Sequence, residues 1–322
     1  LVKMWKRTIY IWPSYLVEPV HRINRLFPGS DIHEIGNNTS GDRDVHNLLD
    51  RLPAHIQFTE KEKSTGKKFL ESLGIKDDQK FVCLNARDSS YLKNRFRNVD
   101  FNYHNYRDSD IDNYLEAAEA LVDLGYYVIR MGADVKKKIK TNNPKIIDYA
   151  TANIRTDFLD IYLAGHCSFC ISTGSGFDNI VGILRTPTVF VNILPIGYST
   201  LFSSRYILIP KHHYSLKEGR RLSMREIFSV GVGYCKKSSC YSDKDIEVIE
   251  NSPDEIKEAS LEMVSKLEGS FKEEDQDFLN QKKFRQLFPD KSIDPISGRI
   301  LHGKIKSKIS SYFLRKNPEW LA

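Results

Sequence analysis

A run of small polar residues follows one of the most apolar stretches of this chain. The sequence FCIS, residues 169–172, leads into Thr-Gly-Ser-Gly and then into the helix-like segment FDNIVGILR. Glycines let backbone N–H groups approach an anion, hydroxyls add donors, and the positive end of a helix dipole favours negative charge. The pattern predicts a phosphate cradle; the alternative is an ordinary strand-to-helix turn capped by Ser175. The residues assigned to the cradle are Ser172, Thr173, Gly174, Ser175, Gly176 and Asp178.

Three better-known motifs do not fit this turn. A P-loop ends in Gly-Lys-Ser/Thr, and no lysine follows Gly176. A dinucleotide fingerprint needs a third glycine where Asn179 stands and an acid about 20 residues further on, whereas residues 190–204 contain none. A hydrolase elbow needs Gly-x-Ser-x-Gly, but the serine here has a glycine directly on each side. The turn therefore indicates anion binding without a familiar nucleotide motif.

Cationic side chains follow the other apolar runs in a similar way. FVCLNA is followed by Arg-Asp, YYVIRMG contains an arginine and ends in glycine, and RYILIP is followed by lysine. An arginine fork matches a diphosphate, and its permanent charge would stabilise a departing phosphate oxygen. A surface ion pair within Arg-Asp is the alternative. The predicted catalytic residues are Arg87 and Asp88, and the predicted donor contacts are Arg130, Gly132, Asn192 and Lys211.

Three further groups have metal-like spacing, and we assign none of them to a metal. Asp108-Ser109-Asp110 stands where a helix is predicted to begin, so capping, with Ser109 as the cap, explains it better. Cys167 and Cys170 lie inside an apolar run, which favours packing in the core. His212 and His213 are expected in a loop. The sequence thus predicts a site without a metal.

The elements that must position these residues alternate along the chain. Apolar runs at residues 81–86, 126–132, 168–173, 186–194 and 205–210 are continuous, which is typical of parallel strands covered on both faces. Helical patterns lie between them, with capping-box signals at Thr59 and Ser252. We therefore predict an α/β fold with a doubly wound, Rossmann-like parallel sheet. The carboxyl ends of its strands should bring the predicted residues to one crevice.

Composition sets the outer limits. A chain of 322 residues with 40% hydrophobic content can bury one large core or two ordinary ones. We predict a partial N-terminal region over 1–76, a Rossmann-like domain over 77–270 and a helical tail over 271–322. The net charge of +6 does not by itself imply nucleic acid. Five cysteines favour a reducing, cytoplasmic compartment, and no apolar run reaches the roughly 20 residues of a spanning helix.

The last segment, HGKIKSKISSYFLRKNPEWL, has the pattern of one amphipathic helix. Leu301, Ile305 and Ile309 share a face, and lysines and arginines cover the rest. Such a helix is typical of peripheral contact with an anionic membrane, here at the inner face. Packing back across the domain junction is the interpretation that we favour, and membrane contact is the alternative.

Several short motifs together resemble a bacterial family of glycosyltransferases with the two-domain GT-B arrangement. They are FVCLNARDSSYL, YLEAAEALVDLGYYVIRMG, FCISTGSGFDNIVGILRTPTVFVNILP, IPKHH and the closing FLRKNPEWL. The resemblance implies that the sheet domain binds a nucleotide-sugar donor and that protein cations, in place of a metal, neutralise the diphosphate. The Arg87 motif is also distantly similar to that of O-fucosyltransferases, where an arginine faces the diphosphate of GDP. A GDP- or UDP-linked donor is therefore expected.

The same resemblance implies transfer of the sugar to a polysaccharide or other glycoconjugate acceptor, with no further cofactor. A complete GT-B enzyme has a full N-terminal acceptor domain, and too few residues are available for one here. By residue type alone, Asp88, His33, Asp42 and Asp44 are candidates for the catalytic base. Two alternatives stay open: a nucleotide-sugar epimerase, and a non-catalytic nucleotide- or glycan-binding domain of a larger assembly. The sequence leaves the acceptor, the stereochemical course and the oligomeric state unspecified.

Overall fold

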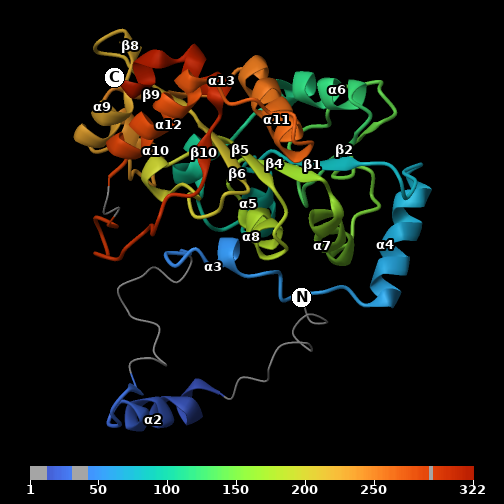
Figure 1. Cartoon of the computed structure of the whole chain (residues 1–322), viewed down its shortest axis with the longest axis horizontal. Helices are drawn as coiled ribbons and strands as arrows, with labels where there is room; N and C mark the ends of the chain where they lie inside the picture. The colour runs from blue at the N-terminus through green and yellow to red at the C-terminus, as the bar shows by residue number, and fades with distance from the viewer. Residues whose placement is uncertain (1–12, 31–42, 290–292) are drawn as a thin grey trace.

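The computed structural model describes residues 13–30, 43–289 and 293–322, and its centre is a parallel β-sheet (Figure 1). The strand order is β10-β6-β5-β4-β1-β2-β3, and each neighbouring pair is parallel. Five strands coincide with the five predicted runs, which confirms the doubly wound α/β class. The strands are β1 Phe81–Asn85, β2 Tyr127–Arg130, β3 Ile146–Ile147, β4 Phe169–Ser172, β5 Thr188–Ile193, β6 Tyr206–Pro210 and β10 Lys308–Ile309.

Helices cover both faces of this sheet. Every residue of β1, β4, β5 and β6 is buried, as the continuous apolar runs require. α6 and α11 pack on one face, and α4, α7 and α8 lie on the other (Figure 1). The α-helices are α2 Ser14–Asn24, α3 Leu48–Arg51, α4 Glu60–Ser72, α5 Ser90–Arg95, α6 Leu115–Asp123, α7 Asp157–His166, α8 Gly176–Ile183, α9 Met224–Ser229, α10 Ser238–Ser242, α11 Pro253–Leu267, α12 Asp275–Leu287 and α13 Ser311–Lys316.

Two of the three helix caps that the sequence predicts are formed. The capping boxes that begin at Thr59 and Ser252 are both formed. Ser109 does not cap: Asp110 accepts the cap bond that begins the 3-10 helix η3, Ile111–Tyr114. Ser109 is buried instead, and its hydroxyl lies 2.8 Å from the Tyr114 hydroxyl. The Asn192 amide also donates to this hydroxyl at 2.8 Å, so a tertiary contact takes the place of a local capping bond.

A second, antiparallel sheet contains His212 and His213, for which the sequence predicts a loop. It consists of β7 His212–Ser215, β8 Arg220–Arg221 and β9 Ile246–Ile249. His212 lies on β7, buried, with its Nε2 3.0 Å from Glu255. Burial alone would raise the pKa of Glu255, but the hydrogen bond and charge of His212 hold it at about 2. The histidine loop is thus a strand, because paired partners make polar residues stable inside the fold.

The C-terminal segment packs against its own domain. β10 pairs with β6, and helix occupies only α13 and the 3-10 helix η5, Pro318–Leu321, so the predicted single helix over 302–321 is wrong. Phe313 and Trp320 are buried. The apolar side chains that membrane contact would need are therefore inside the fold.

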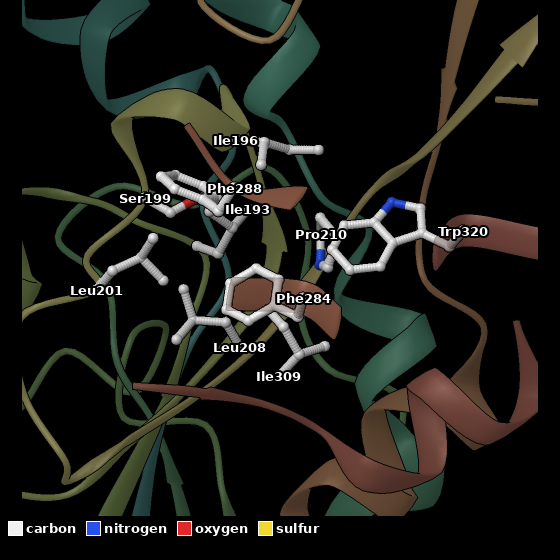
Figure 2. Close-up of a pocket in the computed structure, with 10 residues that line it drawn as sticks. All are labelled: Ile193, Ile196, Ser199, Leu201, Leu208, Pro210, Phe284, Phe288, Ile309 and Trp320. Carbon is white, nitrogen blue, oxygen red and sulfur yellow. The ribbon is translucent and has the colours of Figure 1, made fainter. Parts of the chain in front are cut away.

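Figure 2 shows ten residues around a residual void of about 10 Å³: Ile193, Ile196, Ser199, Leu201, Leu208, Pro210, Phe284, Phe288, Ile309 and Trp320.

The cysteines divide into two groups. Cys167 and Cys170 are free and buried, which confirms the prediction of core packing. Cys235 and Cys240 form a disulfide with a Cα–Cα distance of 5.8 Å, a pairing that the sequence reading did not anticipate. Across the described parts of the chain, no helix is both long enough and apolar enough to cross a membrane.

Candidate functional site

The carboxyl ends of β1 and β4 meet at the centre of the sheet, where the strand order changes direction. Side chains join these two ends: the Asn85 amide donates to Ser175 Oγ at 2.8 Å, and the Arg87 backbone N–H donates to Thr173 Oγ1 at 2.9 Å. Doubly wound sheets bind ligands at such a switch point. The structure therefore brings two predicted motifs, the Arg87 loop and the Ser-Thr-Gly-Ser-Gly turn, to one place. We call this place the switch-point site.

The Ser-Thr-Gly-Ser-Gly turn uses its polar groups within the protein. Ser175 and Asp178 form a capping box at the start of α8, and the Ser172 hydroxyl donates to the Asp178 carboxylate. Burial raises the pKa of Asp178 to about 6, although these hydrogen bonds act in the opposite direction. A carboxylate thus takes donors that a phosphate would use. The turn acts locally as a helix cap, and its further role as a phosphate cradle stays a prediction.

Glycine at position 174 is required by the fold of this turn. Its φ is +78°, and an added Cβ would lie 3.3 Å from Ile193 Cδ1. Its carbonyl accepts a hydrogen bond from the Arg107 guanidinium. Gly176 differs, because it is exposed and an added Cβ would meet no atom within 4 Å. The open side of the turn therefore lies at the first residue of α8.

Three cations converge beside the turn. The Arg87 side chain, 11% exposed, pairs with Asp108. Lys211 Nζ donates to the Asp108 carbonyl at 2.6 Å and lies 4.0 Å from Glu250. Burial and the positive charge of Arg107 lower the pKa of Arg87, and burial also lowers that of Lys211. Arg87, Arg107 and Lys211 lie close enough to repel one another, whereas the carboxylates of Asp108 and Glu250 act in the opposite direction. A further anion placed here would add to the effect of these carboxylates.

Arg107 and Arg130 each keep a buried N–H group without a partner among the described residues, in both cases Nε. Buried polar groups are nearly always hydrogen-bonded, and exceptions need an explanation such as a missing ligand or water. Arg130 is 1% exposed; its Nη1 donates to the Lys137 carbonyl at 2.6 Å and lies 3.3 Å from Asp148. Both arginines therefore have unused donor capacity at the carboxyl edge.

The alternative of an Arg87–Asp88 surface ion pair is not what forms. Asp88 accepts backbone N–H groups from Ser90 at 2.8 Å and from Lys136 at 2.7 Å. Its carboxylate thus ties the loop after β1 to the lysine-rich loop after β2. Arg87 turns to Asp108 instead, which comes from another segment.

A cleft of about 240 Å³ opens beside these residues. Gly132 does not line the cleft but belongs to the loop that carries Lys136 and Lys137 into it: its φ is +151°, and an added Cβ would lie 2.6 Å from Val135 Cγ1. Lys137 bridges Asp110 at 2.5 Å and Asp112 at 2.7 Å, so this lysine is held in place. The lining residues are Ala86, Asp88, Ser89, Asp108, Ser109, Asp110, Ile111, Arg130, Lys136, Lys137 and Glu250.

Asn192 is placed differently from the other predicted donor contacts. It is 1% exposed, and its amide donates to Ser109 at 2.8 Å and to Tyr114 at 3.2 Å. Its backbone N–H and side-chain oxygen both bond Asn251. Asn192 therefore connects the end of β5 to the end of β9, and its contact with a donor stays a prediction.

Sequence reasoning missed the residues that reach the site from a distance. Arg107 and His104 belong to the 3-10 helix η2, Asn102–Arg107, and the His104 carbonyl accepts from Arg87 at 3.3 Å. Burial, with Arg107 and Arg87 nearby, lowers the pKa of His104. Ser238 holds η2 by accepting the Tyr106 N–H at 3.3 Å. The only available signal was an arginine directly before the Asp-Ser-Asp motif.

The candidate bases divide clearly. Asp88 lines the cleft, whereas Asp44 caps α3 by accepting the N–H groups of Leu48 and Leu49. His33 and Asp42 lie outside the described residues. Within residues 13–30, 43–289 and 293–322, no group of three or more His, Cys, Asp or Glu is placed to hold a metal ion.

Comparison with known proteins adds little. No protein-family model matches the chain, and no curated protein matches it. Among solved structures, it is similar to the ADP-heptose LPS heptosyltransferase II of E. coli, with 16% identity and a TM-score of 0.30. The match covers 48% of this chain and 44% of the other, so it spans less than half of either. Such a similarity is too weak to support a function, which must rest on the site.

Proposed function

We propose that this chain binds a nucleotide-diphosphate sugar at the switch-point site and transfers its sugar to a polysaccharide or other glycoconjugate. The observation that supports this proposal is the convergence of Arg87, Arg107 and Lys211 where β1 and β4 end. Guanidinium groups match the paired oxygens of a diphosphate, and closely spaced cations favour an anionic ligand. The unused Arg107 Nε points to the same class of ligand.

The arrangement suits the charge that develops during glycosyl transfer. The bond between the anomeric carbon and the diphosphate oxygen breaks as the acceptor oxygen bonds that carbon, and the leaving diphosphate gains charge. Arg87 and Arg107 would stabilise that charge. The proton of the acceptor hydroxyl must pass to a base, and we propose Asp88 because it lines the cleft. A carboxylate has about four lone-pair sites, so its two backbone hydrogen bonds leave room for this proton.

The adjacent cleft fits one part of the donor. Its volume of about 240 Å³ is below the range of roughly 300–1,000 Å³ usual for whole drug-sized ligands. Carboxylates accept hydrogen bonds from hydroxyls and lysines donate to them, and both types of group line this cleft. We propose that the sugar or the ribose of the donor lies here, beside the diphosphate.

Titration calorimetry tests the donor site. GDP, UDP and their sugar conjugates are titrated with and without magnesium into the wild type, Arg87→Ala and Arg220→Ala. Arg220 is half-exposed and pairs with Glu226 outside the site, which makes it the matched control. We expect magnesium-independent binding of one diphosphate that Arg87→Ala weakens at least tenfold, the effect of a lost charged hydrogen bond of about 1.5–3 kcal/mol. Failure of every nucleotide to bind, or equal affinity in all three proteins, would refute the donor site.

Product analysis then separates transfer from the alternatives. The donor is incubated alone and with glycan acceptors, and its products are identified by mass spectrometry and NMR. Transfer requires the acceptor, and Arg87→Ala should slow it by a factor on the order of 10². Conversion of the donor without an acceptor would instead establish an epimerase. Binding with neither transfer nor hydrolysis would establish a non-catalytic module.

A further inference from the structure

Helix α2, Ser14–Asn24, presents an apolar face that the described parts of the chain do not cover. Leu16, Val20 and Ile23 recur at spacings of four and three residues and therefore share one side of the helix. Their side chains are 45–63% exposed. Glu18 and Arg22 form an ion pair on the opposite side. In Figure 1, α2 lies away from both helical layers of the sheet domain.

This helix needs an external surface to be stable. It has 11 residues and contains Pro19, which supplies no backbone N–H. Isolated helices shorter than about 12–15 residues are marginal in water, and burial of an apolar face normally stabilises them. Because the described residues leave the face formed by Leu16, Val20 and Ile23 exposed, we expect a partner to supply that burial.

The charge around α2 indicates which partner fits. Residues 1–27 contain five basic residues and one acidic residue, a net charge of +4, which leaves only +2 for the other 295 residues. The same stretch contains two of the three tryptophans of the chain, Trp5 and Trp12. Basic residues with Trp and Tyr are typical of segments at an anionic membrane surface. A second copy of the chain would instead bring two segments of the same charge together, which is unfavourable.

We propose that α2 lies in the plane of an anionic lipid surface, with Leu16, Val20 and Ile23 facing the acyl chains and Arg22 and Arg25 facing the headgroups. We therefore assign to the N-terminal segment the membrane contact that the sequence left open as an alternative for the C-terminal segment. This proposal is independent of the proposed activity. It requires only that the sheet domain be folded.

Vesicle flotation tests the contact with a matched pair of variants. Vesicles of phosphatidylcholine alone and of phosphatidylcholine mixed with phosphatidylglycerol are compared for the wild type, Val20→Asp and Asn24→Asp. Both substitutions add one negative charge, but only Val20 lies on the apolar face. We expect binding to the anionic vesicles only, weakened by salt. Asn24→Asp should reduce it by roughly fivefold through charge, and Val20→Asp by about fifty-fold because burial of the valine is lost as well.

Several results would overturn the proposal. Equal losses in the two variants would show that the apolar face does not enter the lipid, and absence of binding to anionic vesicles would exclude the contact. Light scattering that shows a dimer, lost in Val20→Asp, would identify a second copy as the partner. A lower Tm for Val20→Asp than for Asn24→Asp would show that α2 packs on its own domain. The proposal requires equal Tm values, since both side chains lie outside the core.

Discussion

The switch-point site and the apolar cluster of Figure 2 are both built from segments far apart in the sequence, yet they close in opposite ways. The cluster brings residues of β5, β6, α12 and the last turn of the chain around a void of about 10 Å³. The switch-point site gathers three cations, of which Lys211 is buried and Arg87 and Arg107 are partly exposed, and it adjoins a cleft of about 240 Å³. Among the described residues, Arg107 Nε has no partner. One region is filled by its own side chains, whereas the other keeps an open cleft that we propose for a ligand. Mutations should therefore affect stability in the first and binding in the second.

The largest effect is expected in the apolar cluster. Phe284 and Phe278 lie on the same helix, α12, but Phe284 is 1% exposed and Phe278 is 60% exposed. Phe284→Ala should lower the free energy of unfolding by about 3–5 kcal/mol, and Phe278→Ala by less than about 1 kcal/mol. Urea unfolding followed by circular dichroism measures both. Similar losses at the two positions would mean that the cluster does not form.

The next effect should appear in binding alone. Arg107→Ala removes a guanidinium that bonds Gly174 and faces Arg87, so a bound diphosphate loses a charged partner. We expect affinity for the nucleotide to fall by about 1.5–3 kcal/mol, and unfolding to change by less than about 1 kcal/mol because repulsion is relieved as well. Calorimetry and urea unfolding on the same sample give the two numbers. A large stability loss with unchanged affinity would remove the distinction between the two regions.

Gly132 tests whether the loop that carries Lys136 and Lys137 into the cleft contributes to donor binding. Gly132 and Gly74 both have positive φ, but an added Cβ meets Val135 only at Gly132 and has open space at Gly74. Gly74→Ala should cost about 1 kcal/mol through backbone strain, and Gly132→Ala about 1–2 kcal/mol more through the clash. Only Gly132→Ala should also weaken donor binding, since it displaces the loop that holds Lys136 and Lys137. Equal changes in stability and in donor binding for the two variants would show that this loop does not contribute to the site.

The smallest expected effect depends on pH. The pKa of Asp178 is raised from its ordinary 3.8 to about 6, so its carboxyl is neutral below pH 6 and negative above it. Stability from this group is full below pH 3.8 and is lost as pH rises through 6. Affinity for a diphosphate sugar, which does not titrate in this range, should likewise fall about fivefold from pH 5 to 7.5, a difference of roughly 1 kcal/mol.

Asp178→Asn provides the check on that assignment. Without the titrating carboxyl, the affinity measured by calorimetry should change little between these pH values, and at pH 7.5 it should exceed that of the wild type. Any remaining pH dependence would come from other groups of the site, such as His104, whose pKa is lowered by burial, and Asp108, whose pKa is raised by burial. Identical pH profiles for the variant and the wild type would show that Asp178 is not beside the bound anion.

Most of the sheet could be predicted because strands that are buried on both faces require continuous apolar runs, which are visible in the sequence. β3 and β10 were missed because each has two residues, too few for a periodic pattern. β7 was missed because two histidines look polar, although Glu255 makes His212 stable when buried. The single helix expected over 302–321 failed because sheet pairing by β10 outweighs local helical periodicity.

Site residues could be predicted only where they directly follow a strand in the sequence. Arg87 and the turn at Ser172–Gly176 come straight after β1 and β4, so the sheet rule located both. Arg107 and Asp108 return to the same edge through η2, and their approach depends on tertiary packing that no local pattern encodes. The true partner of Arg87 was therefore out of reach of the sequence, and its neighbour Asp88 was considered instead.

The pairing of β10 with β6 has a consequence for synthesis of the protein. β6 ends at Pro210, but the strand that covers its outer edge begins at Lys308. An uncovered edge strand offers free backbone N–H and C=O groups to other chains. While the ribosome adds residues 211–307, the nascent sheet therefore has an open edge next to apolar side chains. This interval is the stage at which a chaperone would protect the chain and at which crowding among nascent chains would promote misassembly.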